Sequence, residues 1–346
     1  MPLHDALARA RAVTAFRPPM IARWLFAAAL LACVRPGAAA GYATLAIPAS
    51  DEGPGLRVAV WTPCAGARGA MAIGPYTVAA VADCPPSGDA LPLIVISHGQ
   101  GGTSLSHHDT AVALADAGYV VASFNHPGDT HGDDKHTSTL AIFESRPADV
   151  SRTISHMLET WDGRARIDPA SIGVFGFSRG GYTALALAGA KPSIAASAAR
   201  LCGHWLSFTD RLCRRLGDDD ARVAPRADPR VRAAVVVDPL NLFDEAGLRG
   251  VQVPVQLWAS ALGGAGVTLA DVEALRAALP PTTEFRVAQG AGHFAFLAPC
   301  PPALQASAPE ICDDPEGFDR AAWHRTMNAE VVAFFDRTLR RAGDGR

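Results

Sequence analysis

The sequence has little charge and no concentration of one sign. Charged residues make up 19% of the 346, and the 31 Lys and Arg against 34 Asp and Glu give a net charge of −3. Nucleic-acid binding requires a basic patch, and no basic block occurs, so the composition argues against nucleic acid as a partner. Hydrophobic residues form 49% of the chain, enough for a large core.

The cysteines lack the spacing of a zinc site, because no C-x-x-C pair or Cys/His cluster occurs. Apart from Cys33, they fall into three short-range couples. Six cysteines can pair in many ways, but each couple could close one loop. We predict three disulfides in sequence order, as an oxidising compartment would permit. The couples are Cys64 with Cys84, Cys202 with Cys213, and Cys300 with Cys312.

The N-terminal segment is typical of a targeting signal. An apolar run at 24–34 follows Arg17 and Arg23 and is too short to span a bilayer. The sequence Ala38-Ala-Ala40 offers a cleavage site before Gly41. We predict that residues 1–40 are a signal peptide, so that a secreted or periplasmic domain of 41–346 remains. An alternative is lipoprotein-type processing, which would leave Cys33 lipid-anchored.

The hydrophobic pattern predicts one α/β domain. From residue 91 onward, apolar strands alternate with helices, which is typical of a mostly parallel sheet covered by helices on both faces. Upstream, short strands at 56–61 and 76–81 are separated by Pro/Gly turns and predict antiparallel edge strands. Residues 191–229 interrupt the alternation, and we predict a cap insertion there. Within it, Trp205 and Phe208 either line an acyl pocket or anchor the cap.

The segment Gly176-Phe-Ser-Arg-Gly180 predicts a nucleophile. An apolar strand at 172–177 leads into it, and a helix of small residues at 182–190 follows. Strand, sharp turn and helix together are the context of a nucleophile elbow, in which the glycines leave the serine exposed above the sheet. Ser178 is therefore the candidate nucleophile.

A serine hydroxyl needs a base, and in this arrangement the base follows it in the chain. Three histidines lie downstream of Ser178. His293 stands in a Gly-rich loop after a late strand at 283–288, where such a base is expected. His324 falls within a predicted C-terminal helix and is expected on its surface, and His204 falls in the cap. We therefore predict His293 as the base.

Two strand ends between nucleophile and base could supply the acid that orients the histidine. Asp238 directly follows the strand at 231–237. The strand at 253–258 has no carboxylate at its end, and Asp271 beyond it is expected to serve a helix N-terminus. We predict that Asp238 is the acid. The other interpretation of Asp238 is a turn residue before proline, and the alternative acid is Asp271.

The fourth component is a Gly-rich turn, His98-Gly-Gln-Gly-Gly102, after the apolar strand at 91–97. Such a turn lets backbone N–H groups approach a developing oxyanion, and the second donor comes from the residue after the nucleophile. The predicted oxyanion donors are the N–H groups of Gln100 and Arg179.

The loop at 125–136 is a competing site, since it holds three histidines and three aspartates that could bind a divalent ion. It is rich in Gly and Pro and has no helical geometry, so the predominant expectation is a solvated loop at the mouth of the pocket. We expect His126 to contribute to substrate binding or to shape the site floor beside Gln100.

Five segments jointly resemble a known family, over about residues 45–340. They are 97–102, 125–129, 176–180, 237–239 and 292–296. The chain is similar to the secreted bacterial α/β-hydrolases called predicted dienelactone hydrolases, which are similar to platelet-activating-factor acetylhydrolases. The resemblance implies the α/β-hydrolase fold and the same triad and oxyanion donors. The acetylhydrolase group has its acid after the earlier strand, which agrees with Asp238.

True dienelactone hydrolases carry a cysteine nucleophile, and this chain carries Ser178. The resemblance therefore implies ester hydrolysis without specifying a dienelactone substrate. The leading hypothesis is a secreted serine hydrolase that cleaves carboxylic esters, of lipid or short acyl groups, without a cofactor. The alternatives are a metal-assisted hydrolase that uses the His126–His136 loop and a non-catalytic binding protein on a hydrolase scaffold.

Overall fold

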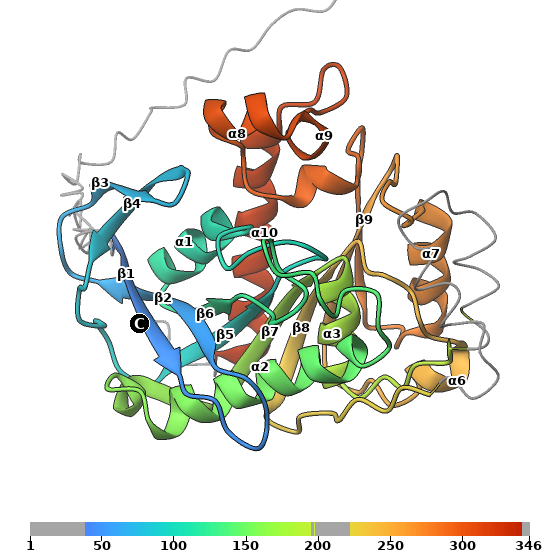
Figure 1. Cartoon of the computed structure of the whole chain (residues 1–346), viewed down its shortest axis with the longest axis horizontal. Coiled ribbons are helices and arrows are strands. Elements are labelled where there is room, and N and C mark those ends of the chain that lie inside the picture. Colours follow the sequence, from blue (N-terminus) through green and yellow to red (C-terminus); the bar gives the residue numbers. More distant parts are fainter. Residues whose placement is uncertain (1–38, 195–196, 198–221, 341–346) are drawn as a thin grey trace, which may run out of the picture. The chain divides into compact units, whose positions relative to one another are not determined.

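A ten-stranded sheet runs through the part of the chain that this computed structural model describes, residues 39–194, 197 and 222–340. Its strand order is β10-β9-β8-β7-β5-β6-β2-β1-β4-β3 (Figure 1). The strands are β1 (Ala39–Ile47), β2 (Leu56–Cys64), β3 (Gly69–Ile73), β4 (Tyr76–Ala82), β5 (Leu91–Ser97), β6 (Val120–Phe124), β7 (Ile167–Phe177), β8 (Val231–Val237), β9 (Val255–Ser260) and β10 (Glu284–Ala288).

One part of the sheet is a parallel block, in which every neighbouring pair of strands is parallel. In sheet order, its strands are β6, β5, β7, β8, β9 and β10. Antiparallel pairs join β1 to β2, β2 to β6 and β3 to β4, whereas β1 and β4 are parallel. The prediction of a mostly parallel sheet with antiparallel N-terminal strands is confirmed. Because the block is parallel, the carboxyl ends of β5, β7, β8 and β9 lie at one edge, where the candidate residues stand.

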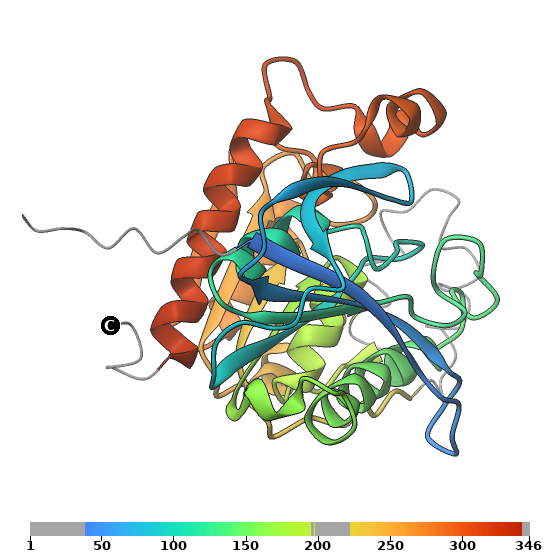
Figure 2. The same ribbon diagram turned by 90° about the vertical axis from the view of Figure 1, so that its left-hand side faces the viewer.

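Helices cover both faces of this sheet. Alternate residues of β5 separate two cores, since Leu93 and Val95 face one and Ile94 and Ile96 face the other. The first core is closed by α2 (Ile142–Glu159), α3 (Arg179–Leu187) and α7 (Leu269–Ala278). The second is closed by α1 (His108–Asp116) and α10 (Arg320–Leu339), which runs along one side of the sheet in Figure 2.

Shorter helical elements lie in the connections. They are η1 (Arg164–Arg166), α6 (Glu245–Leu248), η2 (His293–Phe296), α8 (Pro302–Ser307) and α9 (Pro309–Cys312). Helix α2 begins at Ile142 and includes Pro147 in its interior. Within the described ranges, no helix has the length and apolar character needed to cross a membrane.

Two of the three predicted disulfides are present in the described chain. Cys64 is bonded to Cys84, and Cys300 to Cys312. Several predictions fall outside the described residues: the Cys202–Cys213 bond, Trp205 and Phe208 with most of the cap, Cys33, and nearly all of the signal segment 1–40. Strand β1 already includes Ala39 and Ala40, and Ala40 pairs with Pro63 of β2 and Ala80 of β4.

Candidate active site

Ser178 stands on a strained turn between β7 and α3. Its backbone has φ 55° and ψ −116°, a region that L-residues rarely occupy. The turn is held because the Ser178 N–H donates to the Val237 carbonyl at 2.8 Å. Glycine is required beside it, since a Cβ on Gly176 would collide with the Gly180 carbonyl and one on Gly180 with the Ser97 carbonyl. Strain of this kind is typical of functional sites.

His293 connects Ser178 to Asp238. Its Nε2 lies 3.0 Å from Ser178 Oγ, and its Nδ1 lies 2.6 Å from Asp238 Oδ2. A neutral ring would accept the Ser178 hydroxyl proton at Nε2 and donate its Nδ1–H to the carboxylate. His293 and Asp238 are both buried, at 2% and 0% exposure. The structure therefore brings together the three side chains that were predicted from the sequence. They come from the ends of β7 and β8 and from the loop after β10.

Asp238 is fixed by the neighbouring strand end. It has a positive φ of 41° and accepts hydrogen bonds from the Ser260 N–H at 2.9 Å and the Ser260 hydroxyl at 2.7 Å. Sequence reasoning missed Ser260, because no motif marks it and only a carboxylate was sought at the end of this strand. Asp271 instead forms a capping box with Thr268 at the start of α7, as expected, so Asp238 is the carboxylate beside His293.

The predicted oxyanion donors lie next to Ser178. A Cβ added to Gly99 would be 3.3 Å from the Ser178 Cβ, which places the turn after β5 directly against the elbow. The Gln100 side-chain carbonyl accepts a hydrogen bond from Arg179 Nη2 at 2.6 Å. Arg179 is also the first residue of α3, where backbone N–H groups have no partner within the helix.

Comparison with known proteins agrees with this architecture. A family model described as alpha/beta hydrolase fold matches residues 92–228. A ferulic acid esterase from Streptomyces cinnamoneus is similar over 90% of this chain and 93% of its own, with a TM-score of 0.61 and 19% identity. The chain has an α/β-hydrolase fold.

A second similar structure is the Pyrococcus horikoshii acylaminoacyl peptidase, with a TM-score of 0.51 and 13% identity. It matches 89% of this chain but only 43% of the peptidase. At these identities the likeness extends to the fold alone. No curated protein sequence matches the chain.

A buried ionic network supports the candidate site in this hydrolase fold. Asp129, with no exposed surface, binds Arg146 Nη1 at 2.6 Å and Arg179 Nη1 at 2.9 Å. Arg146, also fully buried, donates through Nη2 to the His98 carbonyl. Burial alone would raise the pKa of Asp129, but the charges of Arg179 and Arg146 hold it below its usual value. No motif or spacing in the sequence pointed to Arg146.

His126 is placed behind the site, with no exposed surface. Its Nε2 lies 2.9 Å from Ser97 Oγ and its Nδ1 3.1 Å from Asp149 Oδ2. This Ser-His-Asp set is inaccessible, since Ser97 is only 3% exposed. Burial lowers the pKa of His126 and raises the pKa of Asp149 to about 7. Of the two roles expected for His126, the fully buried ring fits the support of the site floor, and the substrate contact stays a prediction.

The remainder of the 125–136 loop does not assemble around His126. His131 and His136 are exposed, while Asp129 faces the two arginines. Among residues 39–194, 197 and 222–340, no group of three or more His, Cys, Asp or Glu side chains could hold a metal ion. The expectation of a solvated loop agrees with its exposed second half but is wrong for its first half, which is buried in the ionic network.

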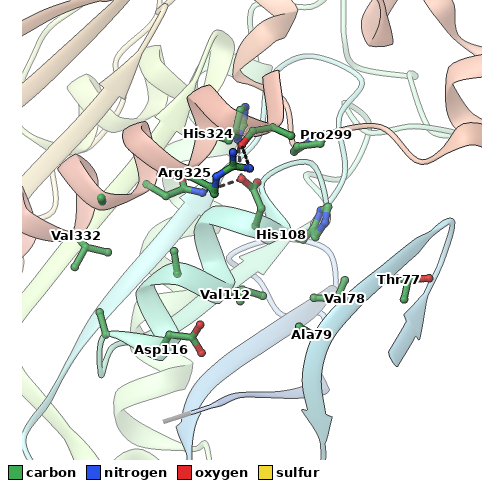
Figure 3. A pocket seen from close by; sticks show the side chains of 16 residues that line it. Thr77, Val78, Ala79, His108, Val112, Asp116, Pro299, His324, Arg325 and Val332 are labelled. Atoms are coloured by element: carbon green, nitrogen blue, oxygen red, sulfur yellow. Dashed lines mark hydrogen bonds and ion pairs between the residues drawn. The ribbon is translucent and has the colours of Figure 1, made fainter. Parts of the chain in front are cut away.

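His324 corrects another expectation. It is 2% exposed, and its ring binds Asp109 at 2.6 Å and the Ala295 carbonyl at 2.8 Å. It lies in the wall of a groove of about 750 Å³ between β4, α1 and α10, with Asp116 and Val78 further along (Figure 3). The ring faces inward because α10 turns this side toward α1. The groove is not lined by Ser178.

Proposed function

We propose that this chain is a serine hydrolase that cleaves carboxylic esters. The observation that carries the proposal is the continuous hydrogen-bonded path from Ser178 Oγ through His293 to Asp238, at 3.0 and 2.6 Å, on a strained elbow. This geometry matches the roles of nucleophile, general base and orienting acid. Similarity to an esterase fold supports the same reaction class.

In the proposed reaction, His293 Nε2 accepts the hydroxyl proton as Ser178 Oγ attacks the ester carbonyl carbon. The negative charge that develops on the carbonyl oxygen is stabilised by the N–H groups of Gln100 and Arg179. His293 then gives its proton to the departing alcohol, which leaves an acyl group on Ser178. His293 then takes a proton from a water molecule that attacks the acyl carbon, and it passes this proton to Ser178 Oγ as the bond to the acyl group breaks and the acid leaves. Asp238 holds the ring with its proton on Nδ1 throughout.

The proposed setting is outside the cytoplasm, as a single hydrolase domain after removal of residues 1–40. The Cys64–Cys84 and Cys300–Cys312 bonds support this, because disulfides persist in oxidising compartments. The proposed relatives are the predicted dienelactone hydrolases and platelet-activating-factor acetylhydrolases, and the proposed substrates are lipid or short-acyl esters.

Substitution Ser178→Ala tests the function. We expect loss of p-nitrophenyl ester turnover by several orders of magnitude and loss of labelling by a fluorophosphonate probe, since both require the hydroxyl. Ser97→Ala is the matched control, because Ser97 also contacts a histidine but is buried. Its variant should still be labelled at Ser178. Labelling that persists in Ser178→Ala, or turnover that a chelator abolishes, would contradict the proposal.

A further inference from the structure

His98 makes one hydrogen bond with each ring nitrogen, and the two partners differ in kind. Nδ1 lies 2.6 Å from the Gly99 carbonyl oxygen, which can only accept. Nε2 lies 3.2 Å from the backbone nitrogen of His126, whose N–H can only donate. The ring must therefore carry its proton on Nδ1 and a lone pair on Nε2. Neither the other neutral tautomer nor the imidazolium satisfies both partners.

The protein environment keeps this ring neutral. His98 is 1% exposed, and Arg146 binds the carbonyl of the same residue. Burial, followed by the positive charge of Arg146, lowers the pKa of His98 to about 3. The nearby Asp129 acts in the opposite direction but is already paired with two arginines. The ring is thus uncharged at neutral pH.

The carbonyl that His98 binds belongs to the peptide unit whose N–H is that of Gln100. A second hydrogen bond, from the Gly102 N–H at 3.2 Å, reaches the same oxygen. A trans peptide is planar, with its C=O and N–H pointing in opposite directions. Two bonds on the Gly99 oxygen therefore fix the direction of the Gln100 N–H, which points away from the His98 ring. Gly99 itself packs against Ser178.

We propose that His98 is a positioning residue for the oxyanion hole: locked as the Nδ1–H tautomer, it orients the Gly99–Gln100 peptide so that the Gln100 N–H is aimed at the developing charge. The inference rests on the proposed hydrolase function and adds a specific role to a side chain that does not touch substrate. A preorganised donor stabilises the transition state without reorganisation during the reaction, so its loss reduces kcat more than it alters KM.

A matched pair of variants separates the two ring nitrogens. The amide nitrogen of His98→Asn can occupy the place of Nδ1 and donate to the Gly99 carbonyl, whereas the amide of His98→Gln reaches the place of Nε2. Each variant loses one buried hydrogen bond, so the free energies of unfolding should fall by similar amounts. We expect His98→Gln to lose about 10²–10³-fold in kcat with KM changed little, and His98→Asn to lose less than about tenfold.

Equal losses of kcat in the two variants, or a change confined to KM, would overturn the proposal. Nitrogen-15 NMR of the histidine rings in the wild-type protein gives a test without mutation. A His98 ring protonated on Nδ1 and unprotonated on Nε2 at pH 5–8 is the expected result, and the Nε2–H tautomer would overturn the proposal. If the wild type has no esterase activity, the proposed function fails, whereas the tautomer measurement still reports on His98 alone.

Discussion

At the residue scale, the candidate site depends on two backbones held in the left-handed region. Ser178 and Asp238 have φ values of 55° and 41°, and each is held by hydrogen bonding with a neighbouring strand end. Val237 accepts from the Ser178 N–H, and Ser260 donates twice to Asp238. The sequence predicted Ser178 through its glycines and Asp238 through its strand. It could not predict Ser260, because a serine at a strand end has no distinctive pattern.

The substitution Asp238→Asn tests whether the Asp238 carboxylate orients the His293 ring. The amide keeps the shape of the carboxyl group but no longer fixes the Nδ1–H tautomer of His293, so we expect ester kcat to fall by about 10⁴-fold with little change in KM. Steady-state kinetics on a p-nitrophenyl ester measures this. Asp271→Asn is the matched control. It weakens a helix cap by about 1 kcal/mol or less and should retain activity. Equal losses in the two variants would refute the role of Asp238.

At the element scale, buried polar contacts join helices to the loops that carry the candidate site. Asp129 connects the loop after β6 to α2 through Arg146 and to α3 through Arg179. His324 on α10 similarly joins Asp109 of α1 to the Ala295 carbonyl beside His293. These partners are up to 215 residues apart in the chain. Their pairing depends on tertiary packing, which hydrophobic periodicity does not encode, so the sequence placed His324 on the surface incorrectly.

Removing the Asp129 charge should be strongly destabilising. Asp129→Asn leaves Arg146 and Arg179 buried without their common counter-ion, and breaking a buried pair in this way costs about 3–5 kcal/mol. Urea unfolding followed by circular dichroism measures the loss. Asp133→Asn, on the same loop but partly exposed beside Lys135, should change stability by less than about 1 kcal/mol. Similar losses in both variants would show that the network contributes little.

The His324 contact should make stability depend on pH. Burial alone would lower the pKa of His324, but Asp109 raises it above the usual 6.5. A histidine with a raised folded pKa contributes stability that is complete below the unfolded pKa and is lost as the pH rises through the folded pKa. The difference in unfolding free energy between wild type and His324→Gln should therefore shrink as pH rises from 6.5. A difference that grows with pH would contradict this.

At the scale of the whole molecule, the sequence predicted the layered α/β architecture because alternation of apolar strands and helices is a strong, repeated signal. It missed β1 and β3 at the N-terminal edge. β3 is largely exposed, with the pattern eeieB, and short, half-exposed strands have no clear period. The cores on the two faces of the sheet bring the ends of β7, β8 and β10 together. The three residues chosen by chain order therefore meet, although they are separated by up to 115 positions.

The disulfides should add to the stability of the molecule. Cys300 and Cys312 close a segment of twelve positions that begins just after His293. In the chain-entropy view, a loop of this size contributes about 3 kcal/mol by restricting the unfolded chain. Replacing both cysteines by serine should lower the unfolding free energy by about that amount, measured by urea denaturation. A reducing agent also breaks the Cys64–Cys84 bond, so it should destabilise the wild type more than the double variant. An equal loss of stability in both proteins would contradict the prediction.

The most direct measurement is the mass of Ser178 during turnover. A slowly hydrolysed ester is mixed with the protein, and the reaction is quenched with acid. The protein is then digested and its peptides are analysed by mass spectrometry. We expect the peptide that contains Ser178 to gain the mass of the acyl group in the wild type and not in Ser178→Ala. Turnover of the ester with an unmodified Ser178 peptide at every time, or with the acyl group on another residue, would contradict this expectation.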